Sequence, residues 1–428
     1  MNSTSRRVVF LTPQLPYPPH QGTAIRNFGL INGLVQHGHR VTLLSFVEPG
    51  QPPPEETPLA GLCSPLIALP APAPRTRGQR LRDLILGHAD MARRLWSPEF
   101  LGALRELLSS QTFDVIHFEG LEMATYLRPL WPLILKRCPD TLLIYDAHNA
   151  EFALQQRIAQ QDLRSLHRLP VAIYSAIQAG RLERFESLVC LTVDHVLACS
   201  RSDAHKLAQL RQPTPISVIP NAIDVGAYAE AGLEKAELPR PALVFTGKMD
   251  YRPNVDAVLW FATKILPRIR QAVPGAHFAI VGQKPHPRLD ALRGDPAITL
   301  TGQVPDIQPY IGAADVYVAP LRMGSGTRLK LLEAMAMGRA VVSTRLGAEG
   351  LDAVNSRHLL LADTPADFAQ AVITLLRDED RRRRLGENAA ALVRERYDWS
   401  VVIPRLEAVY AQESENGSGR TRSDLSLR

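Results

Sequence analysis

The sequence predicts an α/β protein with two doubly wound parallel sheets, and three observations lead to that prediction. Short apolar runs alternate with helix-length amphipathic segments along most of the 428 residues. The runs carry apolar side chains on both faces, as strands buried in a parallel sheet do. About twelve such runs occur, which is many for one sheet, so we expect two sheets of about six strands each.

Six apolar runs predict the strands of the first sheet. They are 8–12, 41–46, 114–118, 141–146, 195–200 and 217–220. Between the first two runs, Ile25, Phe28, Ile31 and Val35 recur at helical spacing and predict an amphipathic helix. The proline-rich stretch 48–58 predicts an internal loop.

Two further segments of this half, 75–105 and 157–184, are predicted to be helical and basic. They carry seven and five arginines with few acidic residues, together with leucine, isoleucine and Trp96. One interpretation is a pair of solvated helix faces. The other is a surface that binds anionic lipid or a lipid-linked substrate.

A second series of apolar runs predicts the second sheet. It comprises 242–247, 277–282, 298–302, 315–320, 340–344 and 358–362. Val255, Val258, Ile265 and Ile269 mark one face of a helix that follows the first of these runs. The proline-broken segment 225–241 precedes the series, and we expect the seam between the two halves there.

The composition excludes several classes of protein. Apolar residues make up 45% of the chain and charged residues 21%, so we exclude disorder throughout, collagen and a coiled coil. The net charge of +6 arises from 49 basic and 43 acidic side chains and is mild for this length. The four arginines at 381–384 lie among acidic residues, which predicts a solvated helix face and no nucleic-acid surface.

Three features favour a cytoplasmic protein. The four cysteines form no C-x-x-C pair, which argues against a disulfide framework and a zinc site. The apolar run after Arg7 is too short for the core of a signal peptide. No apolar run approaches about 18 residues, so we expect no membrane-spanning helix.

Several catalytic and cofactor motifs are absent from the sequence. The loop after the first strand holds one glycine, Gly22, and not the G-x-G-x-x-G of dinucleotide-binding folds. Met323 breaks the spacing of a G-x-S-x-G nucleophile motif, and neither a Walker A sequence nor an H-E-x-x-H occurs. Gly38 between His37 and His39 predicts a helix end and not a metal pair. We therefore expect no metal and no cofactor.

The segment 315–350 predicts a binding site for an anion. A strand ends at Pro320, and the loop Gly324-Ser325-Gly326-Thr327 leads into a helix that Gly338 ends. The free N–H groups and the positive dipole end of such a helix suit a phosphate group.

Two basic residues support this interpretation. Arg328 and Lys330 lie in the first helical turn, where a cation opposes the helix dipole unless an anion binds there. Glu333 follows Lys330 by three positions, and the alternative interpretation of these two is a simple surface ion pair.

These segments, in their order along the chain, resemble the retaining glycosyltransferases of family 4 (group 1), which have the GT-B fold. The most specific match is LLEAMAMGRAVVST at 331–344. Weaker matches are the opening strand, loop and helix at 8–45, YDAHNAE at 145–151, VIPNAID at 218–224, VFTGKMD at 244–250, TGQVPDIQPYIGAADVYVAPL at 301–321 and YDWSVVIPRLEAVY at 397–410. Within the family, the chain resembles exopolysaccharide-associated sugar transferases.

The resemblance implies two Rossmann-like doubly wound domains facing a cleft. Residues 1–235 form the domain on the acceptor side, and 236–396 form the domain that binds the nucleotide-sugar donor. A helix at 397–411 crosses back to the first domain. We expect the polar tail 412–428 to be disordered.

The resemblance also implies roles for individual residues. His148 contacts the donor sugar and the reacting centre, with Asp146 and Glu151 as nearby polar groups. Glu333 accepts hydrogen bonds from the ribose hydroxyls. The remaining candidates serve the base or the diphosphate: Gly22, Lys248, Arg252, Gln303, Val304, Gly324, Ser325, Gly326, Thr327, Arg328 and Lys330.

The sequence departs from the family pattern at three positions. Ser325 stands where the first glutamate of a two-glutamate motif is expected, and Asn254 stands where a lysine is expected. The first loop has Gln21-Gly22 in place of two glycines. We hypothesise that Lys330 or Arg252 replaces the missing cation, while the identity of the donor sugar stays open.

The resulting hypothesis is a retaining transferase that moves a sugar from a UDP- or GDP-sugar to a glycan or lipid-linked acceptor in cell-surface polysaccharide biosynthesis. It would work without metal at the inner face of the membrane, in peripheral contact with anionic lipid and without a nucleic-acid partner. The alternatives are a non-catalytic module that binds a nucleotide sugar and a sugar-nucleotide epimerase.

Overall fold

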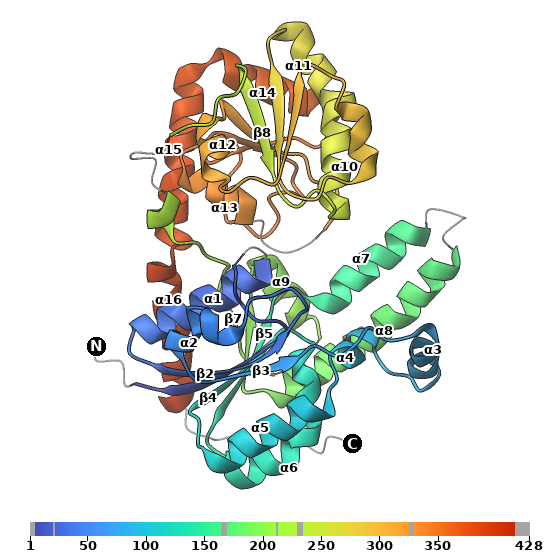
Figure 1. The fold of residues 1–428 in the computed structure, drawn as a ribbon, viewed down its shortest axis with the longest axis vertical. Helices are drawn as coiled ribbons and strands as arrows, with labels where there is room; N and C mark the ends of the chain where they lie inside the picture. The colour runs from blue at the N-terminus through green and yellow to red at the C-terminus, as the bar shows by residue number, and fades with distance from the viewer. Residues whose placement is uncertain are drawn as a thin grey trace. The chain divides into compact units, whose positions relative to one another are not determined.

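Two compact units make up the chain, and each holds one parallel sheet (Figure 1). The computed structural model describes residues 5–19, 22–163, 169–210, 213–228, 234–324 and 329–415. The first unit comprises Met1–Pro220 and Val402–Arg428, and the second unit comprises Asn221–Val401. The predicted α/β class with two parallel sheets is confirmed.

The sheet of the first unit has seven strands in the order β3-β2-β1-β4-β5-β6-β7. They are β1 (Arg7–Thr12), β2 (Arg40–Val47), β3 (Cys63–Pro70), β4 (Val115–Glu119), β5 (Leu142–Ala147), β6 (His195–Ala198) and β7 (Ile216–Val218). All six predicted strands are present. The sequence did not predict β3, an edge strand that carries Pro65 and ends at Pro70, because prolines lower strand propensity and are tolerated at an edge.

Helices flank this sheet, and Figure 1 shows α1 on one side of it and α5 and α6 on the other. The helices before the last one in this unit are α1 (Gly22–Gln36), α2 (Leu59–Leu62), α3 (Arg77–Ile85), α4 (Asp90–Arg94), α5 (Pro98–Ser110), α6 (Leu127–Arg137), α7 (Glu151–Leu163), α8 (Leu169–Thr192) and α9 (Arg201–Ala208). The described residues of the two basic segments are largely helical, as predicted. As predicted, α1 ends before Gly38, whose φ of 87° lies in the left-handed region.

The last helix, α16 (Trp399–Glu415), joins the first unit from Val402 onward. Gly33 of α1 lies against Ile403, and a Cβ atom at Gly33 would overlap that side chain. The glycine therefore permits the close approach of the two helices. The predicted disordered tail began at 412, but the helix runs to Glu415, and residues 416–428 lie outside the described residues.

The sheet of the second unit has six strands in the order β10-β9-β8-β11-β12-β13. They are β8 (Ala242–Thr246), β9 (His277–Val281), β10 (Ile298–Gly302), β11 (Val316–Ala319), β12 (Val341–Ser343) and β13 (Leu360–Leu361). Each corresponds to a predicted apolar run. The helices are α10 (Arg252–Trp260), α11 (Leu266–Ala272), α12 (Gln308–Ala313), α13 (Leu329–Ala336), α14 (Pro365–Arg377) and α15 (Glu379–Arg396), with a π-helical turn at Phe261–Ile265 between α10 and α11.

The two units divide at Pro220, earlier than the expected boundary at 235. The residues after Pro220 are bound by the second unit: Ile223 N–H donates to Tyr397 O at 2.9 Å, and Val225 N–H donates to Asp398 Oδ2 at 3.0 Å. The break in composition at 225–241 marks a loop, but composition alone does not say against which unit a loop packs. In the described part of the chain, no helix combines the length and the apolarity needed to span a bilayer.

Candidate active site

In the first unit, the candidate residue His148 directly follows β5, at the carboxyl end of the sheet. Open α/β sheets bind ligands at this edge because their loops diverge there. The neighbouring strand β4 is in register with β5, so that Glu119 lies opposite Asp146. The ends of both strands thus bring ionisable groups next to His148.

The closest of these groups is Glu119. His148 Nε2 lies 3.1 Å from Glu119 Oε2, and His117 Nδ1 lies 3.1 Å from Glu119 Oε1. Burial raises the pKa of the Glu119 carboxyl, but the hydrogen bonds from His117 and His148 outweigh burial and bring the pKa to about 2. Glu119 is therefore ionised at neutral pH and can only accept hydrogen bonds.

The electrostatics of His148 follow from this carboxylate. Burial by itself lowers the pKa of His148, but the hydrogen bond to Glu119 and the charge on Asp146 raise it above its ordinary value. In the described part of the chain, His148 Nδ1 has no hydrogen-bond partner. His148 thus presents one nitrogen bound to a fixed carboxylate and a second that is available to a substrate.

The second buried carboxylate, Asp146, is bound by Arg26 of α1. Arg26 Nε lies 3.0 Å from Asp146 Oδ2, and Nη2 lies 2.9 Å from Oδ1, a bidentate pair in which both side chains are buried. Arg26 Nη1 also donates to Ile219 O at 3.0 Å. This pair places a fixed positive charge beside two buried negative charges.

His117, Glu119 and Asp146 are of residue types that bind metal ions, and their possible ligand atoms lie within 4.8 Å of one another. Hydrogen bonds to other side chains nevertheless explain why these three residues lie together. Arg26 occupies both oxygens of Asp146, and Tyr410 Oη lies 2.6 Å from His117 Nε2. We therefore interpret this group as an ion network.

In the second unit, the side chain of Lys330 on α13 reaches the carboxyl end of β8. Its ammonium donates to Thr246 O at 2.7 Å and to Asn254 Oδ1 at 2.9 Å, and it lies 4.1 Å from the centre of the Phe245 ring. Asn254 in turn donates from Nδ2 to Lys248 O at 2.9 Å. The asparagine that stands in the place of the expected lysine thus holds the Lys330 ammonium.

Gly247 follows β8 and makes this arrangement possible. Its φ is 152°, and a Cβ atom there would lie 2.7 Å from both Lys330 Nζ and Asn254 Nδ2. Any larger residue would displace the ammonium. The contact is compatible with the hypothesis that Lys330 replaces the missing cation, and that assignment stays a prediction.

Glu333 lies one helical turn after Lys330 on α13 and is buried. Its Oε1 accepts a hydrogen bond from Tyr228 Oη at 3.2 Å. Burial raises the pKa of Glu333, and the Tyr228 hydrogen bond and the Lys330 charge only partly oppose this effect. The alternative of a surface ion pair between Lys330 and Glu333 is wrong, because Glu333 is buried and its carboxylate binds Tyr228.

The other candidates that the structure describes lie near the carboxyl edge of the sheet of their own unit. Lys248 is half exposed and lies 3.7 Å from Asp250 Oδ2. Arg252 is the first residue of α10 and Gly22 is the first of α1. Gln303 and Val304 follow β10, where Gly302 has a φ of 72°.

The glycine-rich loop is described only at its start. Gly324 has a φ of 106°. Ser325, Gly326, Thr327 and Arg328 lie outside the described residues, so their predicted contacts with a phosphate stay predictions.

The prediction from the sequence missed five side chains of these two clusters. Four belong to the first unit and one to the second: Arg26, His117, Glu119, Tyr410 and Tyr228. One signal was available, because His117 and Glu119 alternate on one face of an otherwise apolar strand. Two ionisable residues at such positions need buried partners.

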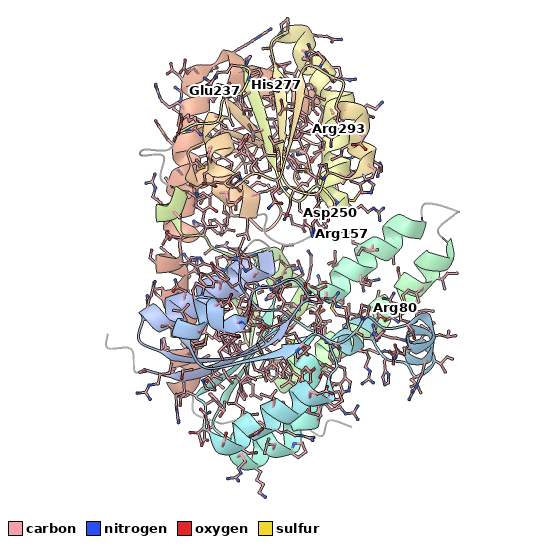
Figure 2. The ribbon with its side chains drawn as sticks, in the orientation of Figure 1. Arg80, Arg157, Glu237, Asp250, His277 and Arg293 are labelled. Carbon is pink, nitrogen blue, oxygen red and sulfur yellow. The ribbon has the colours of Figure 1, made fainter. Side chains whose placement is uncertain are left out.

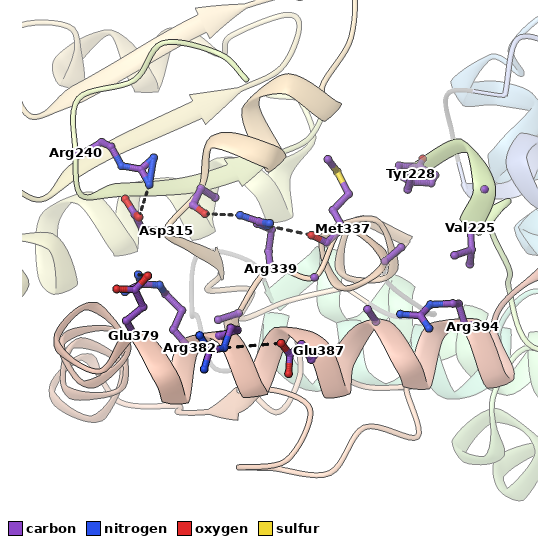
Figure 3. A pocket seen from close by; sticks show the side chains of 17 residues that line it. Val225, Tyr228, Arg240, Asp315, Met337, Arg339, Glu379, Arg382, Glu387 and Arg394 are labelled. Carbon is purple, nitrogen blue, oxygen red and sulfur yellow. Dashed lines mark hydrogen bonds and ion pairs between the residues drawn. The ribbon is translucent and has the colours of Figure 1, made fainter. Parts of the chain in front are cut away.

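The second unit contains a cavity of about 810 Å³ (Figure 3). Arg240 and Asp315, which directly precede β8 and β11, form an ion pair at 2.7 Å in its wall. Arg339 there donates to Met337 O at 3.0 Å. Tyr228, the hydrogen-bond partner of Glu333, also lines the cavity. Because Arg240 and Asp315 mark the amino ends of their strands, and open α/β sheets bind ligands at the carboxyl ends, we do not assign the donor to it.

Comparisons with known proteins place both halves of the chain in one group. Residues 21–227 match a model described as "Glycosyltransferase Family 4", and residues 240–378 match a model described as "Glycosyl transferases group 1". Together the two models account for most of the chain.

Individual relatives agree with these matches. The phosphatidyl-myo-inositol mannosyltransferase of Mycobacterium tuberculosis is 35% identical over 215 residues, which cover 47% of this chain and 54% of that protein. The chain thus spans about half the length of such relatives. The protein of the same name from Mycobacterium leprae is 27% identical over 339 residues, covering 77% of this chain and 82% of its own.

A solved structure supports the fold. Sucrose-phosphate synthase from Thermosynechococcus elongatus superposes with a TM-score of 0.69 over 96% of this chain and 100% of its own, at 18% identity. At this level of identity, the likeness establishes the fold alone.

Proposed function

Because the chain belongs to the family 4 (group 1) glycosyltransferases with the GT-B fold, we propose that it transfers a sugar from a UDP- or GDP-sugar to a glycan or lipid-linked acceptor, with retention at the anomeric carbon. The observation that carries this proposal is the ammonium of Lys330, which two hydrogen bonds and an aromatic ring hold at the carboxyl end of β8. A nucleotide sugar that reacts there leaves a diphosphate, and a fixed cation stabilises the charge that develops on it.

The second unit supplies the donor contacts in this proposal. Lys330 binds the diphosphate, and Lys248 and Arg252 are further cations on the same side of the sheet. Glu333 accepts hydrogen bonds from the ribose hydroxyls, and Tyr228 orients its carboxylate. The backbone near Gln303 and Val304 meets the base. The reaction proceeds without a metal ion, since protein cations take the role of the Lewis acid.

The first unit supplies His148 and the acceptor contacts. Glu119 fixes the Nε2 atom of His148, and the Nδ1 atom of His148 approaches the donor sugar and the reacting centre. Because retention is proposed to follow from attack on the same face as the departing phosphate, no enzyme nucleophile is required.

We further propose that the protein works at the inner face of the cell membrane, in the synthesis of a surface polysaccharide or glycolipid. Leu81, Ile85 and Leu86, in α3 and the residue after it, are exposed next to Arg80 and Arg82, an amphipathic pattern suited to anionic lipid (Figure 2). The mycobacterial relatives, which are named phosphatidyl-myo-inositol mannosyltransferases, also favour a lipid acceptor.

Nucleotide release tests the transferase proposal. The chain is incubated with a panel of UDP- and GDP-sugars, with and without lipid-linked acceptors, and free UDP or GDP is measured. We expect release with at least one donor, and a loss of about tenfold or more in His148→Ala and in Glu333→Ala. Binding without release would favour the non-catalytic module, and conversion to an epimeric nucleotide sugar would favour the epimerase.

Sedimentation with vesicles tests the membrane proposal. We expect the chain to pellet with vesicles of phosphatidylcholine and phosphatidylglycerol but not with phosphatidylcholine alone. Replacing Leu81, Ile85 and Leu86 by serine should abolish this binding. As a matched control, Leu135, which is also exposed but lies on α6, is replaced by serine. Equal pelleting of both variants would contradict the proposed surface.

A further inference from the structure

A continuous chain of hydrogen bonds runs from α16 to His148 inside the first unit. Tyr410 Oη lies 2.6 Å from His117 Nε2, His117 Nδ1 lies 3.1 Å from Glu119 Oε1, and Glu119 Oε2 lies 3.1 Å from His148 Nε2. The first three side chains are fully buried, whereas the His148 side chain is 16% exposed. The chain of hydrogen bonds therefore ends at the single member that a substrate can reach.

The hydrogen atoms of this series of hydrogen bonds can be assigned to individual donors. Since the ionised Glu119 only accepts, both His117 Nδ1 and His148 Nε2 carry a hydrogen. Burial, with the charges on Glu119 and Asp146, raises the pKa of Tyr410 well above its usual value, so the hydroxyl keeps its proton. If Tyr410 donates that proton to His117 Nε2, each donor in the chain has one acceptor.

Packing fixes the same arrangement. The His117 ring stacks on Phe10 with 4.6 Å between the ring centres, and Tyr410 meets it edge-on at 5.6 Å. The ring is therefore held between two aromatic side chains and cannot exchange its nitrogens without repacking them. A polar chain that is both fully bonded and tightly packed has one conformation.

We propose that Tyr410 and His117 are positioning residues for His148: they hold Glu119 in the orientation that fixes the Nε2–H tautomer of His148 and leaves Nδ1 as the acceptor toward the substrate. This inference rests on the proposed function, because it assumes that His148 takes part in transfer. It assigns a role to a residue of the last helix, 262 positions after His148 in the sequence.

Two substitutions should shift the pKa of His148 in opposite directions. The hydroxyl of Tyr410 polarises His117 and makes its Nδ1–H a stronger donor to Glu119. Removing the hydroxyl in Tyr410→Phe weakens that donor, so Glu119 interacts more strongly with His148 and the pKa of His148 rises. Glu119→Gln removes the negative charge, and the pKa of His148 falls.

Other charged or titratable groups face this chain and stay unchanged in both variants. Those near Glu119 come from α1, β5 and the residue after β6, and those near Tyr410 come from the residues just before β1 and β2 and from α16. They are Arg26, Asp146 and Cys199, and Arg6, His39 and Glu407. Glu151 of α7 faces His148.

Nuclear magnetic resonance of the full chain labelled with ¹³C at histidine Cε1 measures the pKa directly. The His148 signal is identified by its loss in His148→Gln. We expect its pKa to rise by about 0.5 unit or more in Tyr410→Phe and to fall in Glu119→Gln. Tyr126→Phe is the matched control, because it removes a buried hydroxyl that binds Leu95 O and Ser97 N elsewhere in the first unit.

The outcomes separate this inference from the proposed function. An unchanged His148 pKa in Tyr410→Phe, or equal shifts in Tyr410→Phe and Tyr126→Phe, overturns the inference even if the wild type transfers sugar. Opposite shifts in the two network variants support it even if no donor is turned over, in which case the proposed function alone fails. If Glu119→Gln does not fold, the comparison of the two tyrosine variants decides. Where transfer occurs, the pH profile of kcat should move with the measured pKa of His148.

Discussion

Replacing Lys330 by methionine removes a charge that we propose to bind the leaving diphosphate. Methionine has a similar length and can still pack against Phe245. The variant leaves Thr246 O and Asn254 Oδ1 without the ammonium that lies 2.7 and 2.9 Å from them. A buried acceptor that loses its donor costs about 1–3 kcal/mol, so we expect the free energy of unfolding to fall while the fold is kept.

The effect on transfer should be larger. A cation about 4 Å from a developing negative charge interacts by about 4 kcal/mol at an effective dielectric constant near 20. The ammonium is already oriented by its anchors, so little of this interaction is lost to reorganisation. Removing a preorganised group of this kind typically lowers kcat by about 10²–10³-fold. We expect a loss in that range for Lys330→Met.

The assay is steady-state release of UDP or GDP at varied donor concentration, with thermal unfolding measured on the same preparations. Lys264→Met is the matched control, because Lys264 is an exposed lysine of the same unit that lies outside the proposed site. We expect the control to keep wild-type values. A kcat/KM for Lys330→Met within about threefold of the wild type, in a folded variant, would refute the role of this ammonium.

Three further predictions concern backbone space and buried charge. Gly247→Ala should lower kcat/KM by about tenfold or more, since its Cβ would push the Lys330 ammonium aside; a wild-type rate would contradict this. Gly33→Ala should destabilise the first unit by about 1–3 kcal/mol in chemical denaturation, and adding Ile403→Ala should recover part of that loss; additive losses would show that the two helices do not meet there. Burial raises the pKa of Glu186 to about 8, so the folded chain binds a proton that the unfolded chain releases near pH 4–5. The free energy of unfolding should therefore fall as the pH rises from about 5 to 8, and Glu186→Gln should flatten this slope; identical slopes would exclude Glu186 as the cause.

The strands show what the sequence can and cannot predict about the fold. A run such as 242–246 is apolar on both faces, and only a strand covered on both sides explains that pattern. The edge strand at 63–70 escaped prediction because Pro65 and Pro70 interrupt its pattern, and five of its eight residues are only partly buried. The position of Asn221 onward in the second unit escaped because it depends on hydrogen bonds to residues near 397.

In the candidate site, too, local motifs were predicted from the sequence but their distant partners were not. His148, Lys330 and Glu333 belong to local motifs, and the structure places His148 after β5 and the Lys330 ammonium at the carboxyl end of β8. Their supporting side chains come from distant positions: Arg26 lies 120 residues before Asp146. No local pattern encodes such a pairing, because it arises only when the sheet brings the two strands and helices together.

The buried network of the first unit is better explained by positioning than by stability. Taking Arg26, Asp146 and Glu119 out of water carries a desolvation penalty that their mutual attraction rarely exceeds, and a well-packed apolar set of the same volume would often be as stable. An apolar set, however, has no means of orienting an imidazole ring. A bonded carboxylate fixes which nitrogen of His148 carries the proton, and a buried one does so without competition from water. On this reasoning, apolar residues in place of the ionised network would leave the unit folded but remove the defined tautomer of His148. The titrations of Tyr410→Phe and Glu119→Gln are designed to detect this separation of folding from transfer.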